Sequence, residues 1–309
     1  INDGDSSTST DLGATGIWLM PVMPSPSYHK YDVLDYYAID EQYGTLEDFD
    51  RLLSECHSRG INVIIDLVLN HTSSEHPWFT TACDYLRSLG EDEEPDLTVC
   101  PYVGYYDFTR SPSGGSMYVV TGTNWYYRGE FTYTMPDLNL DSEEVRSNIS
   151  DIASFWLDRG VDGFRLDAVL YFYESDTTKN VEFLSWFNDL CKSSNPDTYI
   201  VGECWTDAST YNQYYESGID SLFNFAYSGA EGAIVKSVKQ SGKYKTALGV
   251  GQDWVNIQNT LSAYSAAIDA PFFTNHDMGR AAGYFYSPGN SEYWVKTAWA
   301  LNLLMRGNA

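Results

Sequence analysis

Residues 161–167 read Val-Asp-Gly-Phe-Arg-Leu-Asp, an apolar run that carries an arginine and two aspartates. Such a run predicts a short buried strand, and alternate side chains of a strand share one face. Gly163, Arg165 and Asp167 therefore point the same way, with the arginine beside the last aspartate at the carboxyl end. A neighbouring guanidinium lowers the pKa of a carboxylate, which suits a carboxylate nucleophile. A structural ion pair explains the same residues, and the seven residues alone slightly favour that simpler interpretation.

Strands and a helix precede this stretch in a regular order. Thr15–Met20 and Ile61–Val68 are apolar runs that predict buried strands. Between them, Thr45 is a predicted N-cap with Asp48 three residues later, and Gly60 is placed to end the helix. A strand, a helix and a second strand with short connections indicate a right-handed parallel βαβ unit.

The same alternation continues to the end of the chain. Asp141 and Glu144 form a predicted capping box for a helix that leads into residues 161–167. Further predicted elements are helices at 181–191 and 293–305 and strands at 199–204, 221–225 and 270–274. Six strands with polar ends predict an α/β fold, a (β/α)8 TIM barrel with its active site at the carboxyl ends of the strands. A doubly wound sheet is the alternative, but residues 21–26 (Pro-Val-Met-Pro-Ser-Pro) cannot serve as its Gly-rich phosphate loop.

One segment interrupts the alternation. From residue 72 to about 135 the chain is polar and rich in Gly, Ser and Tyr, and it is too long for a plain loop. We therefore expect an inserted small domain of irregular and β structure after the third barrel strand. The predicted organisation is a first barrel part over 1–71, the inserted domain over 72–135, and a second barrel part over 136–309.

The composition limits the classes of partner. A formal net charge of −25 over 309 residues argues against nucleic acid or an anionic membrane. No apolar run approaches the ~20 residues of a membrane span. Aromatic residues make up 16% of the chain, which suits a groove that stacks sugar rings. The five cysteines contain no C-x-x-C pair, which argues against a zinc site; Cys83 and Cys100 flank a polar loop and can either pair or remain free.

Polar side chains gather where the predicted strands end. They are Asp66, Asn70 and His71 after one strand, Arg165 and Asp167 after the next, Glu203 after another, and His276 with Asp277 after the last. Two carboxylates of different protonation state are the basic requirement of glycoside hydrolysis. A metal site is the rival use, but the histidine spacing does not match H-E-x-x-H.

Six segments, in order along nearly the whole chain, resemble motifs of the α-amylase family of glycoside hydrolases. Residues 66–71 (Asp-Leu-Val-Leu-Asn-His), 163–168 (Gly-Phe-Arg-Leu-Asp-Ala), 201–205 (Val-Gly-Glu-Cys-Trp) and 273–277 (Phe-Thr-Asn-His-Asp) resemble its four signatures. Residues 135–139 (Met-Pro-Asp-Leu-Asn) and 28–37 resemble two further motifs. Any single match is weak, whereas six in order are specific.

The resemblance implies a role for each matched residue. Asp167 would be the nucleophile of a retaining mechanism, Glu203 the general acid and then base, and Asp277 the stabiliser of the transition state. Arg165, His71 and His276 would position the reacting glucose, and Tyr31 would stack beneath it. The local chemistry agrees, because an apolar strand before Glu203 and the adjacent Trp205 would raise the pKa of that acid.

The resemblance also implies a Ca²⁺ ion between the barrel and the inserted domain. The matching positions are Asn70, Asp137 and the backbone carbonyl near Tyr171. Oxygen ligands of this kind suit calcium. Without the ion, Asn70 and Asp137 are ordinary strand-end and turn residues.

The sequence departs from the family pattern at three places, and two of these affect the expected specificity. Leu170 and Tyr171 stand where many α-amylases carry Lys-His, which puts the leaving-group subsites in doubt. Lys30 replaces a common glycine. Tyr28 stands where exo-acting oligoglucosidases usually carry an aspartate, and this favours endo-action on longer glucans.

These observations lead to three functional hypotheses. The first is endo-acting hydrolysis of α-1,4 bonds in starch, glycogen or malto-oligosaccharides by a monomer that is secreted, periplasmic or at the cell surface. The second is an exo-acting α-glucosidase or oligo-1,6-glucosidase. The third is a non-catalytic glucan-binding or transporter-associated relative, which is disfavoured because all three catalytic carboxylates are present.

The ends of the chain fall inside the family's barrel. The chain starts at what resembles the end of the first barrel helix and stops in the helix after the seventh strand. The first and eighth strands and the C-terminal β-domain are thus expected to be missing from residues 1–309. Because an open barrel has two unpaired edges, we expect this stretch alone to be poorly stable and inactive.

Overall fold

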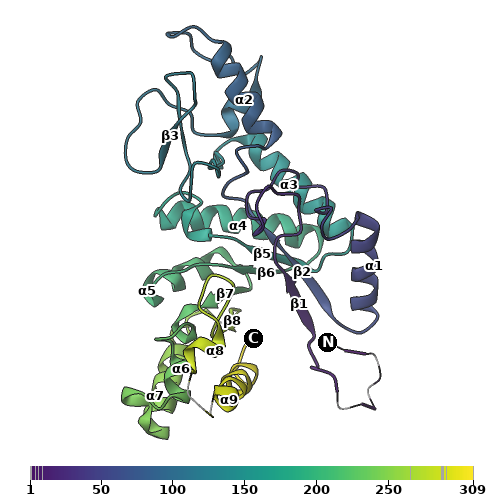
Figure 1. Ribbon diagram of the computed structural model, residues 1–309, viewed down its shortest axis with the longest axis vertical. Coiled ribbons are helices and arrows are strands. Elements are labelled where there is room, and N and C mark those ends of the chain that lie inside the picture. Colours follow the sequence, from purple (N-terminus) through teal and green to yellow (C-terminus); the bar gives the residue numbers. More distant parts are fainter. Residues whose placement is uncertain are drawn as a thin grey trace. The chain divides into compact units, whose positions relative to one another are not determined.

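Parallel strands in chain order organise the structure, a computed structural model that describes residues 2, 3, 5, 7, 8, 10–264, 266–286, 289 and 291–308 (Figure 1). The chain divides into two units. The first unit comprises Ile1–Tyr173 and Asp189–Tyr199, and the second unit comprises Glu174–Asn188 and Ile200–Ala309.

Three strands form the sheet of the first unit. They are β1 (Gly16–Leu19), β2 (Asn62–Leu67) and β5 (Gly163–Leu166), which lie next to one another in this order and are parallel (Figure 1). The β2–β5 register places Asp66 opposite Arg165. Residues of β5 are buried, and so are Val63, Ile65, Asp66 and Leu67 of β2, whereas Asn62 is exposed and Ile64 is half-buried. Such burial is expected where a parallel sheet is covered on both faces.

One helix of the first unit begins at its predicted N-cap residue, and another begins one residue later than predicted. Helix α1 (Leu46–His57) begins after Thr45, and the Thr45–Asp48 capping box is present, as predicted. Helix α3 (Glu143–Asp158) has Ser142, not the predicted Asp141, as its N-cap. The reason is that the Ser142 hydroxyl accepts from the amide of Val145 at 3.3 Å, three residues later.

The segment predicted as an inserted domain contains more helix than expected. Helix α2 (Pro77–Ser88) and the 3₁₀ helix η1 (Pro101–Tyr105) precede an antiparallel pair, β3 (Met117–Val119) with β4 (Tyr126–Arg128). All five cysteines of the chain are buried and free. The domain boundaries at 71/72 and 135/136 stay predictions.

The second unit repeats the pattern of parallel strands. Val201 of β6 (Tyr199–Gly202) pairs with β7 (Ser221–Asn224), and β7 pairs with β8 (Ile268–Pro271). Strand β8 ends earlier than predicted, because Pro271 has no N–H to continue a ladder. The helices are α4 (Thr177–Ser194, divided between the units), α5 (Ala208–Tyr211), α6 (Ala233–Val238), α7 (Ala247–Asn259), α8 (Ala281–Tyr284) and α9 (Ser291–Leu303).

An apolar cluster forms the core of the second unit. It includes Ile234 and Val235 of α6, Phe273 after β8, and Ala298 of α9. Among the residues that the structure describes, no helix has the length and apolar character needed to cross a membrane.

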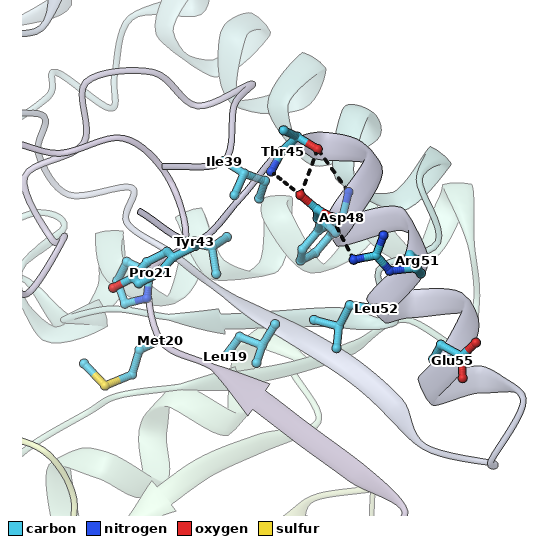
Figure 2. Close-up of a pocket in the computed structure, with 12 residues that line it drawn as sticks. Leu19, Met20, Pro21, Ile39, Tyr43, Thr45, Asp48, Arg51, Leu52 and Glu55 are labelled. Atoms are coloured by element: carbon cyan, nitrogen blue, oxygen red, sulfur yellow. Dashed lines mark hydrogen bonds and ion pairs between the residues drawn. The ribbon is translucent and has the colours of Figure 1, made fainter. Parts of the chain in front are cut away.

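A pocket of about 780 Å³ lies in the first unit, between the end of β1 and helix α1 (Figure 2). Its wall is largely apolar and includes Leu19 and Leu52 (Figure 2). Thr45, Asp48 and Arg51, at the start of α1, also line the pocket and are hydrogen-bonded to one another in sequence (Figure 2). None of the predicted catalytic or sugar-binding residues lines this pocket. It is therefore distinct from the candidate active site.

Candidate active site

The predicted ion pair is present at the carboxyl end of β5. The Arg165 Nη1 atom donates to Asp167 Oδ1 at 2.6 Å. It also donates to both oxygens of Asp66, at 3.0 and 3.1 Å, because the β2–β5 register places Asp66 opposite Arg165. All three side chains are buried. The candidate nucleophile Asp167 is thus held by the Arg165 guanidinium, which Asp66 in turn holds in place.

Tyr31 joins this network from the loop after β1. Its hydroxyl donates to Asp66 Oδ2 at 3.0 Å and accepts from Arg165 Nη1 at 3.4 Å. The Arg165 guanidinium carbon lies 5.6 Å from the centre of the Tyr31 ring and 5.1 Å from that of Trp18. Distances below about 6 Å are typical of cation–π contacts. The ring predicted to stack beneath a sugar is therefore fixed through the arginine.

Asp66 is the functional candidate to which the sequence reasoning assigned no role. Its side chain is fully buried, and burial raises its pKa to about 7. The Arg165 guanidinium opposes that rise, whereas the nearby Asp167 adds to it. The signal in the sequence was its position at the end of the preceding strand, but only the strand register shows that it faces Arg165.

His71 contacts the same loop through its imidazole ring. Its Nε2 donates to the Tyr31 carbonyl at 3.2 Å, since a carbonyl can only accept, and its Nδ1 accepts from Asn70 Nδ2 at 3.4 Å. Burial lowers the pKa of His71, although the Asp167 charge opposes this. A neutral imidazole is therefore the form expected near pH 7.

The remaining predicted catalytic residues belong to the second unit. Glu203 follows β6 and is buried. The His276 and Asp277 side chains, which follow β8, are 3.0 Å apart between Nε2 and Oδ2. The amide of Asp277 donates to Asn275 Oδ1 at 3.0 Å, which holds the turn. Trp205 stacks on Phe225 with ring centres 4.8 Å apart.

The structure thus groups the predicted residues by unit. In the first unit Tyr31, His71, Arg165 and Asp167 are linked by direct contacts. In the second unit His276 and Asp277 are in contact, and Glu203 lies at the end of another strand of the same sheet. The catalytic and sugar-binding roles of these residues stay predictions, as does the raised pKa expected of Glu203.

Two of the residues predicted to bind calcium are in direct contact. Asn70 Nδ2 donates to Asp137 Oδ1 at 3.1 Å. Tyr171 lies in the 3₁₀ helix η2 (Val169–Tyr171), and its ring is 5.4 Å from that of Phe131. Within the described part of the chain, no cluster of three or more His, Cys, Asp or Glu side chains is arranged to hold a metal.

The donors around Asp137 do not fit a calcium ion. The Glu130 amide donates to both carboxylate oxygens, at 3.2 and 3.1 Å, and Arg128 Nε lies 3.4 Å from Oδ2. Calcium takes 6–8 oxygen ligands, whereas the hydrogen bonds and the ion pair described here for the Asp137 carboxylate all come from N–H groups. Burial raises the pKa of Asp137 to about 7, and the Glu130 amide and Arg128 oppose that rise. Calcium binding stays a prediction that this arrangement does not favour.

Comparison with known proteins places the chain among carbohydrate-active enzymes. The family model "Alpha amylase, catalytic domain" matches residues 10–309. Among solved structures, Eubacterium rectale Amy13B superposes with a TM-score of 0.90 at 53% sequence identity, over 96% of this chain and 57% of that one.

Two curated relatives have names that give different activities. Alpha-amylase 3 of Dictyoglomus thermophilum is 40% identical over 276 residues, which is 89% of this chain and 51% of the relative. Glucan 1,6-alpha-glucosidase of Streptococcus pneumoniae is 31% identical over 327 residues, 95% of this chain and 56% of the relative. The chain therefore spans about half the length of the curated relatives that it matches.

Proposed function

Because the chain belongs to the α-amylase catalytic-domain family of glycoside hydrolases, we propose that the full-length protein hydrolyses α-glucosidic bonds of glucans with Asp167 as nucleophile. The family match and the superposition confirm the predicted family and its fold class, a TIM-barrel-like parallel sheet in an incomplete barrel. The single observation that supports the catalytic proposal best is the 2.6 Å contact of Arg165 with Asp167 inside the buried Asp66–Tyr31 network.

The proposed reaction is a double displacement. Asp167 attacks the anomeric carbon while Glu203 gives its proton to the departing glycosidic oxygen, so the C–O bond to the leaving sugar breaks as the bond to Asp167 forms. Glu203 then takes a proton from water, and that oxygen replaces Asp167 on the anomeric carbon. In this scheme Arg165 orients the nucleophile, and Asp277 stabilises the positive charge on the sugar ring.

For the substrate, we propose endo-acting hydrolysis of α-1,4 bonds in starch-like glucans. Tyr28 supports this, because it stands where exo-acting relatives of the family carry an aspartate, and its side chain is 91% exposed. The similarity to an α-amylase agrees. The similarity to a glucan 1,6-α-glucosidase supports the second candidate, an exo-acting glucosidase.

Product analysis of the full-length protein separates these two candidates. Endo-action on amylose releases mixed oligosaccharides early and lowers the viscosity before much reducing sugar appears. Glucose as the sole early product would refute endo-action, and preferential cleavage of isomaltose over maltotriose would support the 1,6-acting candidate.

The catalytic proposal is tested by Asp167→Asn in the full-length protein. We expect the rate of hydrolysis to fall by at least about a thousandfold, because an amide cannot form the covalent intermediate. Asp162→Asn is the matched control on the same chain segment: Asp162 contacts His57 and the Val63 amide before β5 begins. Unchanged turnover by the Asp167→Asn protein would support a non-catalytic relative instead.

A further inference from the structure

Arg128 lies at the junction where the family resemblance implies a calcium ion. It is the last residue of β4, and its side chain is 20% exposed. Its Nη2 donates to Glu130 Oε2 at 2.8 Å, and its Nε lies 3.4 Å from Asp137 Oδ2. A guanidinium is thus placed between two carboxylates next to Asn70, whose amide reaches the same Asp137.

The backbone around Asp137 joins the β3–β4 segment to the end of β2. The Asp137 amide donates to the Arg128 carbonyl at 2.9 Å, and the Leu138 amide donates to the Asn70 carbonyl at 2.9 Å. His71 and Asp137 also form an isolated antiparallel bridge. A cation at Asp137 therefore stabilises a connection between segments that are far apart in the sequence.

We propose that the Arg128 guanidinium supplies the positive charge at this junction in place of a calcium ion, so that the stability of the protein does not depend on calcium. The charge of Asp137 is compensated by this guanidinium and by three N–H contacts, two from the Glu130 amide and one from Asn70. An arginine at this position also excludes a metal, because two cations cannot share one small carboxylate cluster without strong repulsion. This inference goes beyond the proposed hydrolysis and does not depend on it.

The first experiment uses the full-length wild-type protein. We expect its melting temperature to be the same in EDTA and in millimolar CaCl₂, once NaCl has been added to equalise the ionic strength. Isothermal titration of the EDTA-treated protein with CaCl₂ should give no saturable heat. A fall of the melting temperature in EDTA that CaCl₂ reverses would overturn the proposal.

The second experiment tests whether loss of the Arg128 guanidinium makes the melting temperature depend on calcium. Arg128→Gln removes the guanidinium that lies between the Asp137 and Glu130 carboxylates and leaves both without this cation. We expect its melting temperature in EDTA to fall by about 5–10 °C, and CaCl₂ to restore part of this loss. Restoration by Ca²⁺ and not by equal ionic strength of NaCl distinguishes a bound ion from screening.

A matched control lies in the same segment. Arg110 pairs with Glu94, contacts the Glu93 carbonyl and lies over the Trp125 ring at 4.3 Å. Arg110→Gln should lower stability without any response to calcium. A calcium response of the same size in both variants would show a general effect of divalent ions and would refute the proposal. If the Arg128→Gln protein does not accumulate, the titration of the EDTA-treated wild-type protein with CaCl₂ still tests the proposal.

Discussion

Arg165 concentrates the contacts of the candidate site on one nitrogen atom. Nη1 donates to Asp66, Asp167 and the Tyr31 hydroxyl, all within 3.4 Å. The Arg165–Asp167 pair could be predicted because the side chains of a strand alternate. The contact with Asp66 could not be predicted, because the register between β2 and β5 depends on how the strands pack and not on either strand alone.

Lys30, which stands where the family commonly has a glycine, forms an ion pair that could not be predicted from the sequence. It has a φ of 68°, a conformation that usually favours glycine, and its buried Nζ donates to Asp40 Oδ2 at 2.7 Å. Its neighbour Tyr31 carries the ring of the candidate site. The ion pair therefore compensates a strained backbone in the loop that positions that ring.

We predict that Lys30→Met lowers the free energy of unfolding by about 3–5 kcal/mol, because it leaves the buried Asp40 carboxylate without its cation. Urea unfolding of the full-length protein measures this change. Lys296→Met is the control, since Lys296 forms an exposed pair with Glu292 and its loss should have little measurable effect. Equal effects of the two substitutions would contradict the role of the Lys30–Asp40 pair.

Asp269 gives a prediction about pH. Burial raises its pKa to about 6, although donation from Asn224 Nδ2 at 2.9 Å and the Ala270 amide opposes this. The folded protein then binds this proton more tightly than the unfolded chain, whose Asp pKa is about 3.9. The contribution of Asp269 is fully present below about pH 4 and is lost as the pH rises through about 6.

We expect Asp269→Asn to remove this contribution, which is about 2–3 kcal/mol for a pKa of about 6 in the folded protein and about 3.9 in the unfolded chain. The difference in melting temperature between wild type and variant should therefore change between about pH 4 and pH 6 and be constant above about pH 7. Melting curves over that range measure the difference. A difference that does not vary with pH would show that Asp269 is not the group that titrates.

At the scale of secondary structure, β5 requires a glycine at its start. A Cβ atom on Gly163 would lie 1.9 Å from the Tyr199 carbonyl oxygen, which no real contact allows. A Cβ on Gly16 of β1 would lie 3.8 Å from the Asn62 carbonyl oxygen, an ordinary contact. Both glycines begin strands of the first unit, so they form a matched pair.

We predict that Gly163→Ala prevents the full-length protein from accumulating in soluble form or lowers its melting temperature severely, because β5 would have to move away from Tyr199. Gly16→Ala should remain soluble with a melting temperature close to that of the wild type. Soluble expression and thermal melting of both variants test this. A stable, active Gly163→Ala protein would mean that the close approach of backbone at this strand is not needed.

The helices differ in how well the sequence predicted them, and the capping residues explain why. Helix α1 begins with a Thr–Asp capping box, which is a common N-terminal pattern, and its start was therefore predicted correctly. Helix α2 is capped by His76, whose Nδ1 accepts from the Trp78 amide at 3.1 Å, and histidine is outside the usual set of N-caps. Its buried face, with Phe79 and Cys83 four residues apart, was the signal that could have revealed it.

At the scale of the whole molecule, the alternation of strands and helices was enough to predict the fold class. Residues at strand ends could also be nominated, because the barrel fold places active sites there. The cation beside Asp137 could not be predicted, since it comes from Arg128 in a segment without a regular pattern. The sequence motifs therefore identified Asp137 and Asn70, but not the Arg128 guanidinium that compensates the charge of Asp137.

The charge of the whole chain leads to a last prediction. There are 43 acidic and 18 basic residues, so self-repulsion opposes the folded state at neutral pH. Raising the ionic strength from about 0.01 to 0.15 M shortens the screening length from about 30 to 8 Å. It also weakens the surface ion pairs, but each of these is worth at most ~1 kcal/mol.

We therefore expect NaCl over this range to raise the melting temperature of the full-length protein in EDTA by about 2–4 °C, the effect of ~1 kcal/mol in a large domain. Replacing Glu91 and Asp92 by Gln and Asn removes two charges from the acidic run at 91–94 and spares Glu94, which pairs with Arg110. This variant should melt higher than the wild type at low salt and respond less to NaCl. A melting temperature that falls with NaCl would mean that local ion pairs outweigh the repulsion of the surplus carboxylates.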